Sequence, residues 1–253
     1  MGKRIGLLDE IRGIDYIAMI LYHIYFDIAF VYGHDLPQWL DVIMYWVQPF
    51  IAGLFIVLAG ISCNFSKNNF KRGALYFFLG MLLTFVTAVL MPSELILFGI
   101  LHFLGIACLI YGFLGQFTES IPWVVGVVIF SLLYVVTLNI PNGYIGFEGL
   151  FTVRMPDFFY GHYHLFPLGF PSRSFTSADY FPLIPNLFLF FAGASLGQYF
   201  TATRASSGIN MTRFRGLAFL GRHGLWIYLL HQPVVIVVLE LIFKLTGQNT
   251  VFL

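Results

Sequence analysis

The sequence predicts an all-α polytopic transmembrane helix bundle of about seven spans, with a cytoplasmic N-terminus and a long extracytoplasmic segment between spans five and six. Of its 253 residues, 59% are hydrophobic and only 10% are charged, against about 45–50% and about 25% in ordinary globular proteins. The apolar residues stand in long continuous runs, unlike the alternating stretches of about ten residues in a barrel. This apolar composition and a net charge of +1 exclude a disordered chain and a nucleic-acid partner.

Seven runs are long enough to cross a hydrocarbon core of about 30 Å, which takes about 20 apolar residues per helix. They lie near 13–33, 42–63, 73–91, 95–115, 121–140, 181–200 and 217–243. No internal repeat divides them, so residues 1–253 are expected to form a single transmembrane domain embedded in membrane lipid. So few spans are also compatible with a homodimer.

The basic residues predict the orientation, because cytoplasmic flanks carry the excess of Lys and Arg. With seven spans, one set of flanks holds Lys3, Arg4, Arg12, Lys67, Lys71, Arg72, Arg204, Arg213, Arg215 and Arg222. The other set holds Arg154, Arg173 and Lys244. The N-terminus is therefore expected in the cytoplasm and the C-terminus outside.

Residues 141–180 fall outside in this orientation and are long for a connection without structure of its own. The segment is rich in aromatic residues and prolines and carries few charges. We predict an outer cap or re-entrant segment over an outward-facing cavity. The alternative is an interfacial stretch that its Phe and Tyr residues hold among the lipid headgroups.

The first span carries ionisable residues, each of which costs at least about 2–3 kcal/mol to insert into a membrane. Arg12 and His23 are eleven residues apart, only about 20° past three full helical turns and about 16 Å along the axis. Asp27 follows one turn beyond His23. His34 comes next, beside Asp35. We predict a polar stripe from the cytoplasmic side to the outer mouth. The alternatives are a headgroup anchor for Arg12 and an ion pair with another helix for Asp27.

Other spans add further polar candidates. Glu94 stands at the outer end of the fourth span, and His102 lies two turns inside it. His231 lies in the last span beside Pro233, which predicts a kink. For both histidines, a hydrogen bond that serves packing alone is the open alternative. No motif for a metal ion is present, so none is expected.

Four pieces of the chain, in order, resemble the small bacterial members of the heparan-alpha-glucosaminide N-acetyltransferase catalytic-domain family. They are LLDEIRGIDYIAMILYHIYFD, LFGILHFLGIACLIYG, FTSADYFPLIPN and AFLGRHGLWIYLLHQPV. The resemblance covers most of the chain and is strongest at 8–66, 94–112, 176–200 and 217–234. The spacing of Arg12 and His23 also resembles the Arg-x10-His pattern of bacterial membrane O-acyltransferases that modify surface sugars.

The resemblance implies an acyl-CoA-dependent acetyltransferase of the bacterial plasma membrane. Such enzymes move acetyl, or another acyl group, from cytosolic acetyl-CoA to an amine or hydroxyl of an extracytoplasmic sugar or glycan. Aligned on the RGI motif, His34 falls on the active-site histidine of the lysosomal enzyme, and His23 falls on an asparagine. We therefore expect His34 to act as the base on the acceptor. His23, oriented by Asp27, is expected to bind the thioester, relay the proton or carry the acyl group.

The remaining candidates follow from what the two substrates need. The phosphates of CoA need cations on the cytoplasmic side, and the candidates are Arg12, Arg222, Arg215, Arg72 and Lys71. Contacts with the sugar are expected from Asp35, His102, Glu94, His231, Asp179 and Tyr180. The rival function is a proton-coupled secondary transporter or carrier, which also uses His and Asp inside the membrane.

Overall fold

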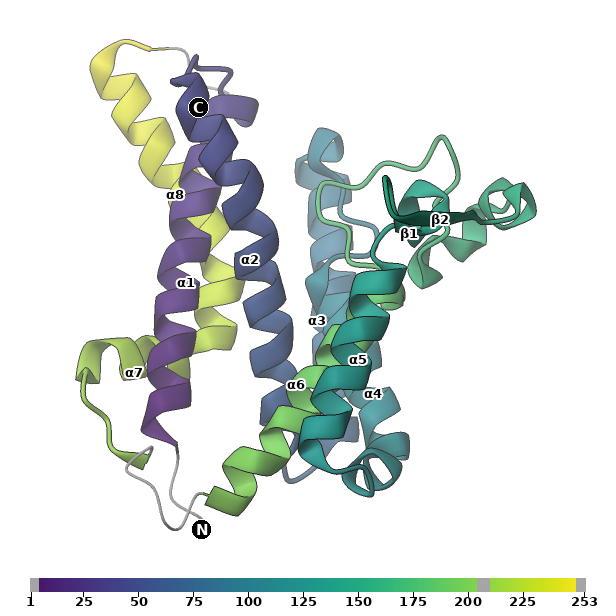
Figure 1. Ribbon diagram of the computed structural model, residues 1–253. Coiled ribbons are helices and arrows are strands. Elements are labelled where there is room, and N and C mark those ends of the chain that lie inside the picture. Colours follow the sequence, from purple (N-terminus) through teal and green to yellow (C-terminus); the bar gives the residue numbers. More distant parts are fainter. Residues whose placement is uncertain (1–4, 204–209, 249–253) are drawn as a thin grey trace. The chain divides into compact units, whose positions relative to one another are not determined.

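The computed structural model describes residues 5–203 and 210–248, so Lys3, Arg4 and Arg204 of the predicted cytoplasmic flanks lie outside these ranges. Within them, seven helices are long and apolar enough to cross a membrane, which confirms the predicted all-α polytopic bundle. The α-helices are α1 (Gly6–Phe26), α2 (Gln38–Cys63), α3 (Asn69–Leu90), α4 (Ile100–Glu119), α5 (Trp123–Thr137), α6 (Leu183–Thr203), α7 (Arg215–Arg222) and α8 (Gly224–Thr246) (Figure 1).

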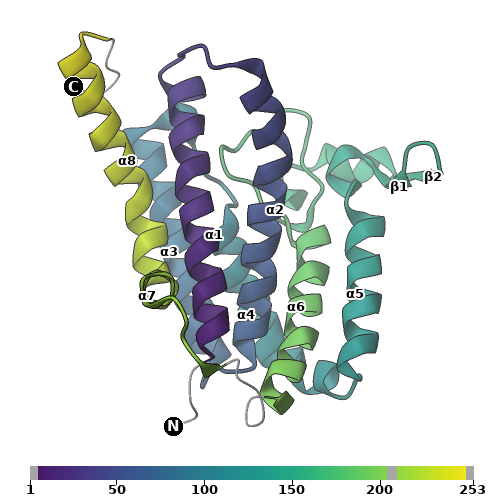
Figure 2. The same cartoon turned by 60° about the vertical axis from the view of Figure 1, so that its left-hand side comes forward.

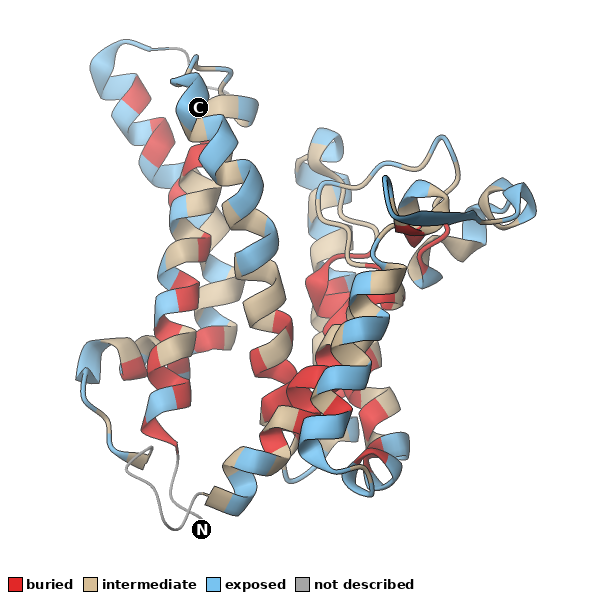
Figure 3. Ribbon diagram, viewed as in Figure 1, coloured by how far each residue is buried: buried red, intermediate tan, exposed pale blue. Residues whose placement is uncertain are grey.

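The chain divides into two compact units. One unit contains residues 1–55 and 203–253, and in it α1 packs against α7 and α8 (Figure 2). The other contains residues 56–202, and its α3 packs along α4. Buried residues gather along α1 in the first unit and along α4 and α6 in the second (Figure 3). That residues 1–253 act as a single domain stays a prediction.

The first and last spans differ from their predicted bounds. Helix α1 begins at Gly6 instead of residue 13, because its charged first turns are packed and not left in water. A Cβ at Gly13 would overlap the backbone of Leu217, so this glycine lets the two segments approach closely. The predicted run 217–243 is two helices, since the chain leaves the helical conformation at His223 between α7 and α8.

The fourth span begins at Ile100 instead of residue 95, because the residues before it are extended and hydrogen-bonded to the end of the 141–180 segment. The amide of Ala178 donates to the Leu95 carbonyl at 3.0 Å. The amide of Phe181 donates to the Phe98 carbonyl at 2.9 Å. These backbone bonds join this end of the segment to the start of α4.

The 141–180 segment has secondary structure of its own. Strands β1 (Tyr144–Phe147) and β2 (Phe151–Arg154) form an antiparallel hairpin. Two 3₁₀ turns follow, over Asp157–Gly161 and Tyr163–Leu168. Stacked aromatic pairs hold the rest together, among them Phe166 and Phe175 with ring centroids 4.7 Å apart. Residues 141–180 are called the outer cap below, and their place outside the membrane stays a prediction.

Candidate functional site

Two imidazole rings lie together in the first unit. His23 of α1 and His231 of α8 have ring centroids 4.6 Å apart, and their planes meet at 75°. Both side chains are half-buried within helices that are long and apolar enough to span a membrane. The structure thus pairs a residue predicted to be catalytic with one predicted to contact the acceptor.

The hydrogen bonds of the two rings indicate where each carries its proton. Nδ1 of His23 lies 2.9 Å from the Met19 carbonyl oxygen, and Nδ1 of His231 lies 2.7 Å from that of Tyr228. A carbonyl oxygen only accepts, so both rings donate from Nδ1 and, when neutral, keep a lone pair on Nε2. Nε2 of His231 is buried and has no hydrogen-bond partner among the described residues. The pair is therefore equipped to accept a proton.

Asp27 follows His23 by one helical turn and is fully buried. Its Oδ1 accepts a hydrogen bond of 2.8 Å from Nε2 of Gln232, the residue after His231. The Met19 carbonyl holds one ring nitrogen of His23, and the orienting role expected of Asp27 stays a prediction. The Asp27–Gln232 bond ties α1 to α8 one turn beyond the two imidazoles.

A π-helix over Asp27–Val31 changes the end of the predicted stripe. One additional residue in a turn rotates everything beyond it by about 100° on the helix surface. His34 lies past the end of this π-helix, so regular helical spacing does not relate it to His23. Its ring is half-buried with its centroid 4.7 Å from that of Phe243, and its Nε2 has no hydrogen-bond partner in the described part of the chain. Asp35 is exposed.

At the other end of α1, two arginines share one buried carboxylate. Nη1 of Arg12 lies 2.9 Å from Oδ1 of Asp9, and Nε of Arg222 lies 3.3 Å from Oδ2 of the same residue. Asp9 is buried, whereas the Arg222 side chain is 40% exposed. The structure thus brings together two of the residues predicted to bind CoA phosphates, and Arg222 keeps donors available to a ligand.

Glu10 fixes the start of α7 beside these arginines. Its Oε1 accepts hydrogen bonds from the backbone amides of Arg213 and Phe214, the latter at 2.8 Å. A carboxylate is favourable there because the amides at a helix start lack partners within the helix. Arg215, the first residue of α7, is exposed. Sequence reasoning missed Asp9 and Glu10, although two acids next to an arginine at the start of an apolar run were the available signal.

The two predicted cations of the second unit have different surroundings. Arg72 donates from Nε to the Tyr76 hydroxyl at 3.2 Å and from Nη2 to the Ala59 carbonyl at 3.4 Å. Its guanidinium also lies 5.3 Å from the centre of the Tyr76 ring. Lys71 is exposed. The guanidinium of Arg72 therefore joins α2 to α3, while Lys71 remains accessible.

His102 of α4 is buried against α3. Thr84 donates its hydroxyl proton to the Ile96 carbonyl at 2.6 Å, so it can only accept from Nε2 of His102, 3.3 Å away. Nδ1 of His102 faces Gly80, where an added Cβ would lie only 2.9 Å from this nitrogen. These surroundings support the packing alternative for His102.

The other predicted acceptor contacts lie near the start of α4. Oδ2 of Asp179 accepts a 3.0 Å hydrogen bond from the Ile100 amide. Burial raises the pKa of the Asp179 carboxyl to about 6, although this hydrogen bond acts in the opposite direction. Tyr180 donates its hydroxyl to the Phe166 carbonyl at 2.6 Å, and burial raises the pKa of this phenol. Glu94 is half-buried in a 3₁₀ turn, Pro92–Glu94.

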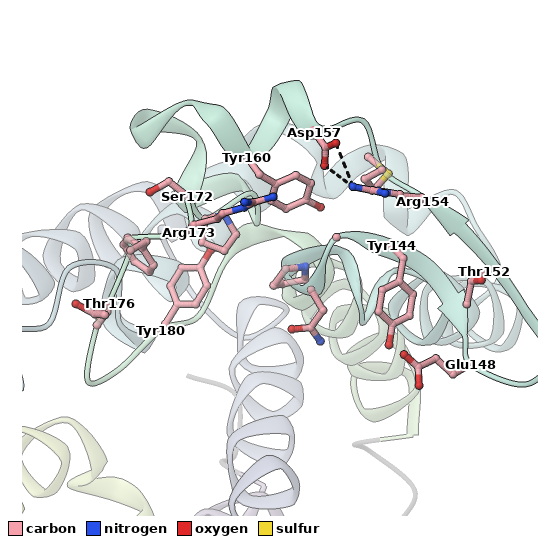
Figure 4. A pocket seen from close by; sticks show the side chains of 17 residues that line it. Tyr144, Glu148, Thr152, Arg154, Asp157, Tyr160, Ser172, Arg173, Thr176 and Tyr180 are labelled. Carbon is pink, nitrogen blue, oxygen red and sulfur yellow. Dashed lines mark hydrogen bonds and ion pairs between the residues drawn. The ribbon is translucent and has the colours of Figure 1, made fainter.

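The outer cap contains an open pocket of about 950 Å³. Figure 4 shows side chains of the β1–β2 hairpin on one side of it and those of residues 172–180 on the other. Tyr180 lines this pocket.

Comparison with known proteins identifies the family. The heparan-alpha-glucosaminide N-acetyltransferase catalytic family matches residues 4–233. The chain belongs to this family. No curated protein and no solved structure matches the chain. The protein is therefore an integral membrane member of an N-acetyltransferase family.

The part that matches the N-acetyltransferase family includes both rings of the histidine pair and every predicted site residue. Glu240 of α8 lies beyond it and was missed from the sequence. Its side chain is buried, and Oε1 accepts a 3.2 Å hydrogen bond from the Tyr32 hydroxyl. A carboxylate within an apolar span was the signal that could have found it. Among the described residues, no three His, Cys, Asp or Glu side chains are grouped to hold a metal ion.

Proposed function

We propose that this protein transfers an acetyl group from cytosolic acetyl-CoA to an amine or hydroxyl of an extracytoplasmic sugar or glycan at the bacterial plasma membrane. The family match supports acetyl transfer. The observation that carries the proposal is the pair of imidazoles, His23 and His231, whose Nδ1 atoms are used by backbone carbonyls. Their Nε2 atoms are left for chemistry.

The proposed reaction needs a base because the attacking nitrogen or oxygen must lose a proton. The acceptor atom forms a bond to the acetyl carbon, and its proton passes to Nε2 of His23. The C–S bond of the thioester then breaks, and the CoA sulfur takes up a proton from the pair. His231, with its own buried Nε2 beside the first ring, shares the proton between these steps.

His34 is the second proposed base. A sugar amine is an ammonium ion near neutral pH and must lose one proton before it can attack. Nε2 of His34, which accepts no hydrogen bond from the described residues, is suited to take that first proton. His23 then takes the second, so each proton has a stated destination. For a hydroxyl acceptor, a single proton is removed.

The proposed donor site uses the cations at the start of α1. Arg12 and Arg222 both contact Asp9, and their guanidinium groups are proposed to bind the CoA phosphates. Arg215 is exposed at the start of α7 and can add to it. Lys71 and Arg72 complete the predicted set, although the contacts of Arg72 give its guanidinium a packing role. Asp35, Glu94, Asp179 and Tyr180 remain proposed contacts with the acceptor.

The test uses purified protein in lipid vesicles with acetyl-CoA labelled in the acetyl group and a glucosamine disaccharide. We expect labelled disaccharide and free CoA to appear in equal amounts, measured by mass spectrometry. If acetyl-CoA is neither bound nor consumed, the proposal fails. Uptake of the disaccharide driven by a proton gradient, without acetyl-CoA, would favour a carrier instead.

A further inference from the structure

The open pocket of the outer cap has the dimensions of a ligand site. Its volume of about 950 Å³ lies at the upper end of the range of roughly 300–1,000 Å³ for small-molecule sites. Its walls come from the β1–β2 hairpin and from residues 171–180, so the pocket lies within one compact unit (Figure 4).

Aromatic rings in this pocket are held in place by their hydroxyl groups. Tyr160 donates to the Ile140 carbonyl and Tyr180 donates to the Phe166 carbonyl. Neighbouring aromatic rings support both, with Phe170 5.7 Å from Tyr160 and Phe175 4.9 Å from Tyr180. Because the hydroxyl groups are already bonded, these residues offer mainly their ring faces. Ring faces pack well against the C–H faces of a sugar ring.

The charged side chains of the pocket are balanced in sign. Arg154 makes two hydrogen bonds to Asp157, of 2.9 and 3.1 Å, and both side chains are exposed. Arg173 and Glu148 also line the pocket and are exposed, and neither has an ion pair within the described residues. Two cations and two anions give no net attraction for a polyanion such as a nucleotide. Planar charged groups of both signs instead suit the many donors and acceptors of sugar hydroxyls.

We propose that this pocket binds a hydroxyl-rich saccharide, with its sugar rings against Tyr160 and Tyr180 and its hydroxyl groups bonded to Arg173 and Glu148. The identification of this saccharide as the acetyl acceptor rests on the function proposed above. The saccharide-binding pocket itself rests only on the geometry of the outer cap.

The experiment measures binding of a glucosamine disaccharide to the full chain in lipid nanodiscs by saturation-transfer NMR and titration. We expect Arg173→Gln and Glu148→Gln each to weaken binding by about tenfold, the effect of losing one hydrogen bond to a charged group. Both side chains are exposed, so the fold is expected to persist. Leu150→Ala is the matched control, because Leu150 is exposed at the hairpin turn and does not line the pocket. Its affinity should equal that of the parent.

The outcomes separate the two proposals. Absence of saccharide binding, or equal affinity in all three variants, overturns the saccharide pocket even if acetyl-CoA is consumed. Binding that Arg173→Gln weakens, in a protein that never consumes acetyl-CoA, supports the pocket and overturns the acetyl transfer. A disaccharide that carries a carboxylate and binds more tightly than the neutral or amino disaccharide would contradict the balanced charge.

Discussion

A histidine within an apolar helix has different surroundings in the two compact units. In the first unit, His23 stands beside a second imidazole, with the ring centroids 4.6 Å apart. In the second, His102 is held by Thr84 on one nitrogen and faces the backbone of Gly80 on the other. Both residues interrupt apolar spans and have the same insertion cost. Hydropathy alone gives no reason to assign them different roles.

The comparison teaches that the atoms around the second ring nitrogen distinguish the two roles. A hydrogen bond to one nitrogen is common to His23, His231 and His102. In the first unit the remaining nitrogens belong to two rings that lie side by side. In the second, helix packing covers the remaining nitrogen. Nε2 of His231 and Nδ1 of His102 are both buried without a hydrogen-bond partner among the described residues, so the second imidazole is what distinguishes the two sites.

The largest expected effect tests this difference directly. His23→Ala should lower the rate of acetyl-CoA consumption by about 10²–10⁴-fold, because it removes the proposed base. His102→Ala should lower the free energy of unfolding by about 1–3 kcal/mol, because Thr84 loses its buried partner. Its rate of acetyl-CoA consumption should fall less than tenfold. Rates are measured from CoA release and stability from unfolding in detergent.

The control for this pair is His223→Ala, since His223 is exposed and its Nδ1 bonds to the Phe219 carbonyl. Its rate should match that of the parent. A His102→Ala rate as low as that of His23→Ala would show that the two units do not differ in the proposed way.

The next effect concerns the second imidazole. His231→Ala should lower the rate by about 10–10²-fold, less than the change at His23, because it removes the partner that shares the proton and not the primary base. If the rings act as a unit, the double variant His23→Ala/His231→Ala should be no slower than His23→Ala alone. If the fold-reduction in rate of the double variant equals the product of the two single reductions, the rings act independently.

The seven spans were predictable because the membrane fixes the length of an apolar helix. Local bounds were less so, because they depend on contacts between distant segments. The start of α4 at Ile100 depends on backbone bonds from residues 178–181 to residues 95–98. The early start of α1 at Gly6 depends on packing against residues after 210. The hydropathy pattern predicts neither of these contacts.

The site was predictable as single residues but not as a constellation. His23 and His231 each stood out as ionisable groups in apolar spans, yet nothing in their spacing places them in contact. The π-helix at Asp27–Val31 could not be anticipated from the helical repeat, and it interrupts the regular spacing between His23 and His34. Glu240, a carboxylate within an apolar span, carries the same signal as the histidines.

A smaller effect is expected from a substitution that disturbs the packing of α7 against the charged start of α1. A Cβ at Gly221 would lie 2.7 Å from the carbonyl carbon of Asp9, so Gly221→Ala should cost about 1–3 kcal/mol of stability. It should also disturb the Arg222–Asp9 pair. Gly216→Ala in the same helix is the control, because no atom of the described residues lies within 4 Å of its Cβ position. The control should gain up to about 1 kcal/mol from helix propensity, and a Gly221→Ala protein as stable as the parent would contradict the close packing of α1 and α7.

The smallest effect tests the second unit through its dependence on pH. The pKa of Asp179 is raised by burial to about 6 in the folded protein, above its ordinary value of 3.8. The folded state therefore binds the proton more tightly than the unfolded state, and stability should fall by about 1–2 kcal/mol as the pH rises from about 4 to about 6. Asp179→Asn keeps an oxygen for the Ile100 amide but cannot ionise, so unfolding temperatures of this variant should lose that part of the decline. If the two proteins lose stability equally over this range, the carboxyl of Asp179 is not desolvated at the start of α4, and the second unit does not bury this charge as proposed.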